Sequence, residues 1–176
     1  MRSATTTPAS RVRRTFSISP WSASELPARI IGIGQPMAGD DGVGVAIARR
    51  VREICERTDV EIIELSEPSA LVPLLIDGAN PVVLIDALVG GGEPGDVLHF
   101  APKAGWRSAR LLSSHGVGVR DAIELAKILE PAAASHNIDI VAVTIVRPDH
   151  YCESLSPAVA AAIDKAAALA LRLAGG

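Results

Sequence analysis

Short apolar runs alternate with longer segments of helical spacing from residue 29 to the end of the chain. The run PVVLIDAL at 81–88 is almost wholly apolar, which is typical of a strand buried on both faces. Strands separated by helices favour a mostly parallel sheet with a helical layer on each face. We therefore predict an α/β fold, a single-domain three-layer sandwich over 29–176 with a twisted sheet of about five strands. The expected strands are 30–33, 60–65, 81–88, 96–100 and 138–146, and the expected helices are 42–58, 69–76, 116–129 and 156–174.

Residues 1–28 differ in composition from the rest of the chain. They are rich in Ser, Thr, Arg and Pro, and Glu25 is their only acid. We expect a disordered extension, or a start codon placed too far upstream, because the segment has too little apolar surface to offset the entropy of ordering it. Two targeting signals remain alternatives, since Arg13-Arg14 loosely resembles a twin-arginine signal and the composition resembles an organelle transit peptide.

The composition limits the classes of partner. A net charge of −3 and a pI near 5.8 argue against nucleic acid or an anionic membrane as the main partner. No apolar run reaches the ~18 residues that a membrane-spanning helix needs. The two cysteines, Cys55 and Cys152, lack CxxC spacing, which is typical of reduced thiols in a cytosolic protein. We therefore expect a cytoplasmic protein. Its core should be aliphatic, because only 3% of its residues are aromatic.

The stretch IIGIGQPMAGDDGVGV at 30–45 carries the first functional signal. An apolar strand enters a turn rich in Gly and Pro, and Asp40 and Asp41 follow where a helix should begin. In open α/β sheets, ligands bind beyond the carboxyl ends of the strands. A turn of neutral N–H groups would attract phosphate there, whereas two aspartates attract a cation. The charge of this turn therefore predicts a cation site.

The two aspartates are expected to have different roles. Asp40 is predicted to N-cap the helix that follows, where a negative charge also interacts favourably with the helix dipole. One carboxylate meets that need, so Asp41 is the one expected to point into the crevice. Ser156 is likewise predicted to N-cap the last helix, with Pro157 in its first turn.

Two further side chains complete a possible metal site. Asp86 interrupts an apolar strand close to its carboxyl end, which is costly unless the acid is paired, hydrogen-bonded or metal-bound. His115 stands immediately before a predicted helix. The ordinary alternatives are an aspartate that accepts a hydrogen bond from a loop N–H and a histidine that is hydrogen-bonded on the surface or in the core. Together with Asp41, they form a mixed oxygen and nitrogen set suited to nickel or zinc with open coordination positions. The other histidines, His99, His136 and His150, are interpreted as structural or solvent-exposed.

A dinucleotide site is the main competing hypothesis for the first turn. Gly32 and Gly34 begin a GxGxxG pattern, but Met37 occupies its third position and the acidic pair stands where pyrophosphate would lie. No GxSxG elbow is present, and neither cysteine has a nucleophile-like setting. These departures disfavour nucleotide binding.

Four blocks of the chain, in order, resemble the hydrogenase maturation endopeptidases. They are GIGQPMAGDDGVG, VVLIDALVGGGEPG, SSHGVGVRDAIELAKIL and LSPAVAAAI, and the resemblance covers about residues 29–173. It implies a twisted, mainly parallel sheet between helices. It also implies an endopeptidase that removes a short C-terminal extension from the large-subunit precursor of a NiFe hydrogenase after nickel insertion. By position, the resemblance makes Asp41, Asp86 and His115 the nickel ligands.

The implied function leaves several points open. Nickel would be carried by the precursor, with zinc or another divalent ion as the alternative occupant. The catalytic residues are not assigned, although Asp41 and Asp86 are candidates for an aspartyl-type or metal-dependent mechanism. The alternatives are a peptidase of the same fold acting on a different precursor and a non-catalytic module that binds nickel or the precursor.

One segment departs from the family pattern. After its second strand the family usually has an acid, two glycines and a small hydroxyl residue, whereas this chain has ELSEPS at 64–69. Glu64 and Glu67 are the candidates for the acidic role. The loss of the glycines would change the backbone of a loop beside the cleft, and a peptidase of the same fold acting on a different precursor would explain this change.

Overall fold

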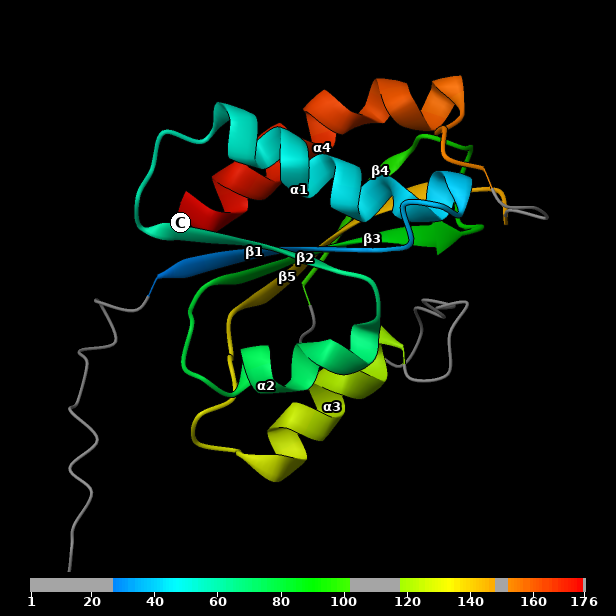
Figure 1. The fold of residues 1–176 in the computed structure, drawn as a ribbon. Coiled ribbons are helices and arrows are strands. Elements are labelled where there is room, and N and C mark those ends of the chain that lie inside the picture. The colour runs from blue at the N-terminus through cyan, green and yellow to red at the C-terminus, as the bar shows by residue number, and fades with distance from the viewer. Residues whose placement is uncertain (1–26, 102–117, 148–151, 176) are drawn as a thin grey trace, which may run out of the picture.

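The computed structural model describes residues 27–101, 118–147 and 152–175. In these residues five strands form one sheet between two pairs of helices (Figure 1). The strands are β1 (Ala28–Ile33), β2 (Val60–Leu65), β3 (Val82–Val89), β4 (Val97–Phe100) and β5 (Ile138–Ile145). The helices are α1 (Val43–Ile54), α2 (Leu71–Leu75), α3 (Val119–Leu129) and α4 (Pro157–Gly175), with short 3-10 turns η1 (Gly39–Gly42) and η2 (Pro68–Ala70).

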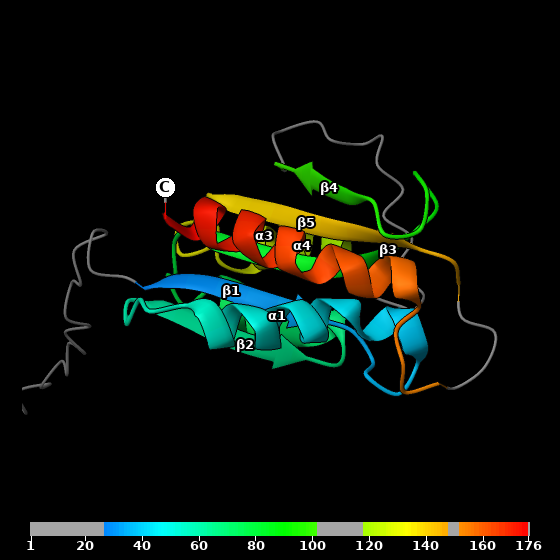
Figure 2. The ribbon, with the colours of Figure 1, turned by 90° about the horizontal axis from the view of Figure 1, so that it is seen from above.

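The sheet has the order β2-β1-β3-β5-β4. The first four strands in this order are parallel, and β4 pairs with β5 in the antiparallel direction at the edge (Figure 2). Helices α1 and α4 cover one face, and α2 and α3 cover the other (Figure 1). The predicted three-layer α/β fold with a mostly parallel five-stranded sheet is therefore confirmed.

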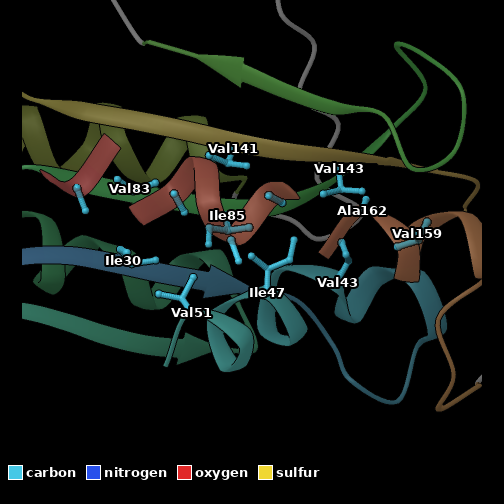
Figure 3. Packing of buried hydrophobic residues seen from close by; sticks show 14 of the residues in the cluster. Ile30, Val43, Ile47, Val51, Val83, Ile85, Val141, Val143, Val159 and Ala162 are labelled. Carbon is cyan, nitrogen blue, oxygen red and sulfur yellow. The ribbon is translucent and has the colours of Figure 1, made fainter. Parts of the chain in front are cut away.

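The alternation of side chains along the strands divides the core into two layers. Val83 and Ile85 of β3 pack under α1 and α4, and Figure 3 shows Ile85 near Ile47 of α1. Val82 and Leu84 pack on the opposite face with residues of α2 and α3. Because both faces of β3 are covered by helices, its side chains are apolar in both directions. Asp86 is the one acid among them.

The predicted elements exist, and several of their bounds differ. The helix predicted over 42–58 begins as η1 and ends at Ile54, because Cys55 adopts an extended conformation and the next three residues are exposed. The helix predicted over 69–76 is a 3-10 turn followed by five residues of α2. Ala28 already begins β1, and the expectation for residues 1–26 lies outside the described residues. None of the helices in the described ranges combines the length and the apolar character needed to cross a bilayer.

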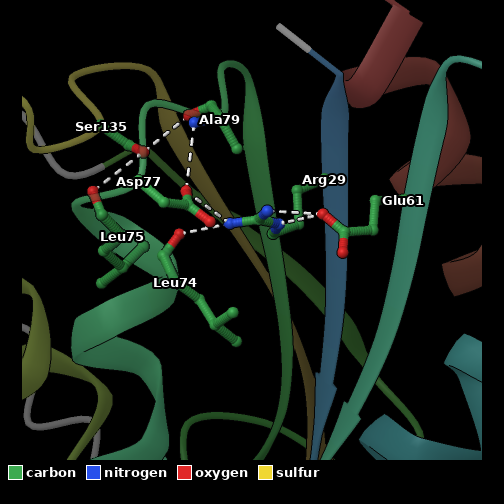
Figure 4. A network of polar contacts seen from close by, with 7 residues as sticks. All are labelled: Arg29, Glu61, Leu74, Leu75, Asp77, Ala79 and Ser135. Carbon is green, nitrogen blue, oxygen red and sulfur yellow. Dashed lines mark hydrogen bonds and ion pairs between the residues drawn. The ribbon is translucent and has the colours of Figure 1, made fainter. Parts of the chain in front are cut away.

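A buried arginine forms a network of hydrogen bonds at the end of the sheet where the parallel strands begin (Figure 4). Arg29 of β1 is 6% exposed. Its guanidinium donates to Glu61 of β2 at 2.8 Å and, on the other side, to the carbonyl of Leu74 in α2 at 2.6 Å and to Asp77 after α2 at 2.8 Å. Burial acts to lower the pKa of the guanidinium, but the hydrogen bonds and charges of Asp77 and Glu61 hold it above its ordinary value. This network lies at the edge opposite to the candidate site and stabilises the fold.

Candidate functional site

The candidate site lies between β1 and β3, where the chain changes direction across the sheet. From β1 the chain continues into α1 on one face, whereas from β3 it continues through β4 into α3 on the other face. Such a switch point leaves a crevice beyond the carboxyl ends of two neighbouring strands, and ligands of open α/β sheets bind there. Asp41 follows β1, and Asp86 lies near the end of β3. The fold therefore brings both predicted aspartates to one switch point.

Glycines let the acidic turn, residues 34–42, lie directly on the strand ends. Gly44, in the first turn of α1, is so close to the sheet that a Cβ there would lie 2.2 Å from the Ile33 carbonyl oxygen and 2.5 Å from that of Ile85. Gly34 has a φ of 146°, and a Cβ there would lie 2.0 Å from the Asp41 carbonyl oxygen. Side chains at these positions would push Asp41 away from β3, so the glycines of the motif set the position of the acid.

Asp41 makes hydrogen bonds within the acidic turn through both its backbone and its side chain. Its N–H group donates to the Ala38 carbonyl at 3.3 Å, and its Oδ2 accepts a hydrogen bond of 3.3 Å from the Gln35 N–H. The side chain is partly buried. These contacts fix the carboxylate beside the carboxyl end of β1.

Asp86 is a partly buried acid inside β3. Its Oδ1 accepts a hydrogen bond of 2.8 Å from the Ala87 N–H. A hydrogen bond from a backbone N–H was the structural alternative to metal binding for this residue. Burial, and to a smaller extent the negative charge of Asp41, raise the pKa of its carboxyl to about 7 against the lowering effect of the Ala87 hydrogen bond. The two carboxylates therefore interact electrostatically. At neutral pH the pair attracts a proton or a cation.

The prediction that Asp40 caps its own helix is wrong. Neither η1 nor α1 has a side-chain cap, and the Asp40 Oδ1 instead accepts a 2.6 Å hydrogen bond from the Ser156 N–H at the start of α4. Gly39 donates to the Cys152 carbonyl, which adds a second link between the acidic turn and the segment before α4. Asp40 therefore caps a helix from a distant part of the chain, because α4 begins beside the acidic turn.

Ser156 occupies the expected position before α4, and its carbonyl accepts the first helical hydrogen bond, from Ala160. Its buried hydroxyl, however, has no hydrogen-bond partner in the part of the chain that the structure describes. The predicted position of the cap is correct, but the Asp40 carboxylate does the capping.

The family model described as hydrogenase maturation protease matches residues 45–173. This chain belongs to the hydrogenase maturation protease family. The matched residues begin after Asp41 and include the positions of Asp86 and His115. A comparison with curated proteins found no match.

Solved structures of maturation proteases share the fold. The HycI protease of Thermococcus kodakarensis KOD1 is 24% identical with a TM-score of 0.66, and the match covers 85% of this chain and 93% of that one. The HybD protease of Thermococcus kodakarensis is 25% identical with a TM-score of 0.66 and coverages of 85% and 99%. The HybD endopeptidase of E. coli is 19% identical with a TM-score of 0.70 and coverages of 84% and 91%. Each match spans nearly the full length of the known protein.

The third predicted ligand of this family member, His115, lies outside the described residues. Within the described ranges, no group of three or more His, Cys, Asp or Glu side chains is arranged to hold a metal. Of the other histidines, His99 is paired with Asp139 on the edge strand, with 2.6 Å between Nε2 and Oδ1. His136 is exposed, and His150 lies outside the described residues.

Glu64 does not supply an acid to the crevice of this maturation protease. It lies on the α1 face of β2, where Arg49 and Arg52 of α1 bind its carboxylate. Burial acts to raise the pKa of Glu64, but hydrogen bonds from Arg52 and Arg49 hold it below its usual range. Asp86 faces the opposite side of the sheet, so these two acids do not share a site.

The altered segment after β2 nevertheless lies beside the acidic turn. Gln35 Nε2 donates a 3.3 Å hydrogen bond to the Ser66 carbonyl, and Glu67 is exposed next to it. Sequence reasoning found the departure from the family pattern in this segment. It missed the contact, because Gln35 and Ser66 meet only once β1 and β2 pair.

Proposed function

We propose that this chain is an endopeptidase that removes the C-terminal extension of a NiFe hydrogenase large-subunit precursor in the cytoplasm. Asp41, Asp86 and His115 bind the nickel that the precursor carries, so the metal is the signal by which a loaded precursor is recognised. Membership of the maturation protease family supports the reaction class. The placement of Asp41 after β1 and of Asp86 near the end of the neighbouring strand β3 is the observation that supports the metal site.

The donor chemistry of this pair fits a divalent cation. Two nearby carboxylates resist being ionised together, and a cation between them removes that repulsion. An imidazole as third donor suits nickel or zinc, with positions left open for groups of the precursor. His115 stands three residues before Gly118, which precedes α3, so the chain between them spans at most ~11 Å. Val119 of α3 packs in one cluster with Ile33 at the end of β1.

Either carboxyl is also a candidate for proton transfer during cleavage. A carboxyl group with a pKa near 7 is matched to general acid and base chemistry at neutral pH, and burial gives Asp86 such a pKa. The negative charge of Asp41 contributes to this raised pKa.

The decisive experiment is a processing assay with the full chain. Precursor with and without nickel is incubated with the protein, and the mass of the large subunit is measured. We expect loss of the C-terminal peptide from the nickel-loaded form alone. Cleavage of the nickel-free form would overturn the metal-recognition role. Binding of the precursor without any shortening would instead identify a non-catalytic module.

Variants of the proposed ligands test the site itself. Asp41→Asn, Asp86→Asn and His115→Ala are each expected to abolish cleavage. His136→Ala and Asp164→Asn change exposed residues outside the crevice and serve as matched controls. Unchanged cleavage by any of the three ligand variants would remove that residue from the site.

A second candidate function is a peptidase of the same fold that cleaves a different precursor by the same chemistry. The contact between Gln35 and Ser66 favours it, because the segment that departs from the family pattern touches the acidic turn. Several large-subunit precursors tested in parallel would separate the candidates. Cleavage of an unrelated precursor in preference to all large subunits would establish the second one.

A further inference from the structure

Thr144 of β5 carries a buried hydroxyl that the fold itself does not use. The residue is 1% exposed, and its Oγ1 has no hydrogen-bond partner in the ranges that the structure describes. The backbone is fully engaged: the Thr144 N–H donates to the Asp96 carbonyl at 2.9 Å, and its own carbonyl accepts from Gly95 at 2.8 Å. Buried hydroxyls almost always have a partner, so an unpaired one in a native protein marks a place for an ordered water or ion or for a catalytic role.

The register places this hydroxyl on the same face of the sheet as Asp86. Ile140 of β5 and Leu84 of β3 both pack toward α2 and α3, and side chains two residues apart share a face. Asp86 pairs with Ala142, so Thr144 is one diagonal step nearer the carboxyl edge. Asp86 and Thr144 are therefore neighbours at the carboxyl ends of adjacent strands.

The spacing between the two side chains suits one water molecule. Strands about 4.8 Å apart with a rise of about 3.3 Å per residue put diagonal neighbours about 8 Å apart. Both side chains stand on this face, and where they lean towards each other their oxygens come within the ~5.5 Å that one bridging water spans. A single water spans that gap with two ordinary hydrogen bonds.

We propose that Thr144 and Asp86 hold a water molecule between them, and that Thr144 is a positioning residue for hydrolysis. The inference rests on the proposed peptidase function and adds to it the origin of the attacking water. The oxygen of this water bonds to the scissile carbonyl carbon and the C–N bond breaks. One proton of the water is transferred to the amine that leaves, and the other remains on the new carboxyl group.

Two substitutions at this position test the proposal in the processing assay. Thr144→Val keeps the shape of the side chain and removes the hydroxyl, whereas Thr144→Ser keeps the hydroxyl. We expect Thr144→Val to lower kcat by about 10- to 100-fold with little change in KM, which is at or below the low end of a direct acid–base contribution because Thr144 only positions the water. Thr144→Ser is expected to retain at least about a third of the wild-type kcat. A Thr144→Val enzyme with wild-type kcat, or a Thr144→Ser enzyme as slow as Thr144→Val, would overturn the role.

Two substrate-free measurements keep this test separate from that of the peptidase function. Thermal unfolding of Thr144→Val should occur at or above the wild-type temperature, because no protein hydrogen bond is lost. A marked drop in that temperature would assign the hydroxyl a structural role and overturn the proposal. A high-resolution crystal structure should place a water within hydrogen-bond distance of both Thr144 Oγ1 and the Asp86 carboxyl, and its absence would also overturn the proposal. If the wild-type chain cleaves no precursor, the proposed function fails, whatever these two measurements give.

Discussion

The Asp40 carboxylate accepts a 2.6 Å hydrogen bond from the backbone N–H of Ser156, 116 positions further along the chain. This bond caps the amino end of α4 with a negative charge, which the helix dipole favours. It also holds the acidic turn in place, because Asp40, the neighbour of Asp41, is bound to the start of α4 near the end of the chain. Helix α4 therefore supports the candidate site although it contributes no ligand to it.

Removal of this cap should destabilise the fold in a graded way. Asp40→Ala is expected to lower the free energy of unfolding by about 1 to 2 kcal/mol, because the Ser156 N–H loses its acceptor. Asp40→Asn keeps an acceptor oxygen and should lose less than half as much. Urea denaturation of the two variants measures the difference. Equal losses for both would show that the charge, and not the hydrogen bond, is the stabilising feature.

The accuracy of the sequence predictions follows the range of the interactions. Strand β2 occupies Val60–Leu65, the predicted range, because its local pattern of apolar residues suffices to define it. The convergence of Asp41 and Asp86 was predictable from the common direction of parallel strands. The partner of Asp40 was not, because it depends on where α4 begins. The burial of Arg29 was missed for the same reason, since its acceptors come from β2 and from the end of α2.

The Arg29 network should matter for stability and not for activity. Arg29→Ala leaves Glu61 and Asp77 without their cation, and we expect a loss of about 2 to 4 kcal/mol. This is at the low end for a buried pair, because both acids are nearly half exposed and water screens them. Chemical denaturation measures the loss. Cleavage per folded molecule should stay at the wild-type level, because the network lies at the opposite edge of the sheet.

Arg50→Ala is the matched control for this prediction. Arg50 binds Glu53 and Asp164 through ion pairs on the surface, where solvent screening is strong. We expect no measurable change in stability. A loss as large as that of Arg29→Ala would mean that burial is not what makes the Arg29 pairs important.

Gly44→Ala tests the close packing that places the acidic turn. The added Cβ would overlap the backbone carbonyls of Ile33 and Ile85, and neither strand can move without breaking its ladder. We expect a loss of about 2 to 3 kcal/mol, as for an overpacked core position, together with weaker binding of Ni²⁺ to the isolated chain. Calorimetry gives both quantities. Ala168→Ser, which also adds one atom on an exposed position of α4, should change neither.

The raised pKa of Asp86 makes the stability of the metal-free protein fall as pH rises. Its carboxyl titrates near pH 7 in the folded chain and near 3.8 when unfolded, so between these values the folded state binds more protons. Stability contributed by the protonated carboxyl is complete below about pH 4 and is lost progressively up to about pH 7. Three pKa units set an upper limit of about 4 kcal/mol, and because the side chain is partly exposed we expect about 1 to 3 kcal/mol.

Asp86→Asn should remove this dependence, because an amide does not titrate. The variant is expected to be more stable than the wild type at pH 8 and nearly equal to it at pH 4, as measured by urea denaturation in a chelating buffer. Ni²⁺ added to the wild type should bind more weakly at pH 6 than at pH 8, since the metal must displace the Asp86 proton. If the wild type and Asp86→Asn show the same pH profile, Asp86 is ionised throughout, and a cation is not needed to relieve its burial beside Asp41.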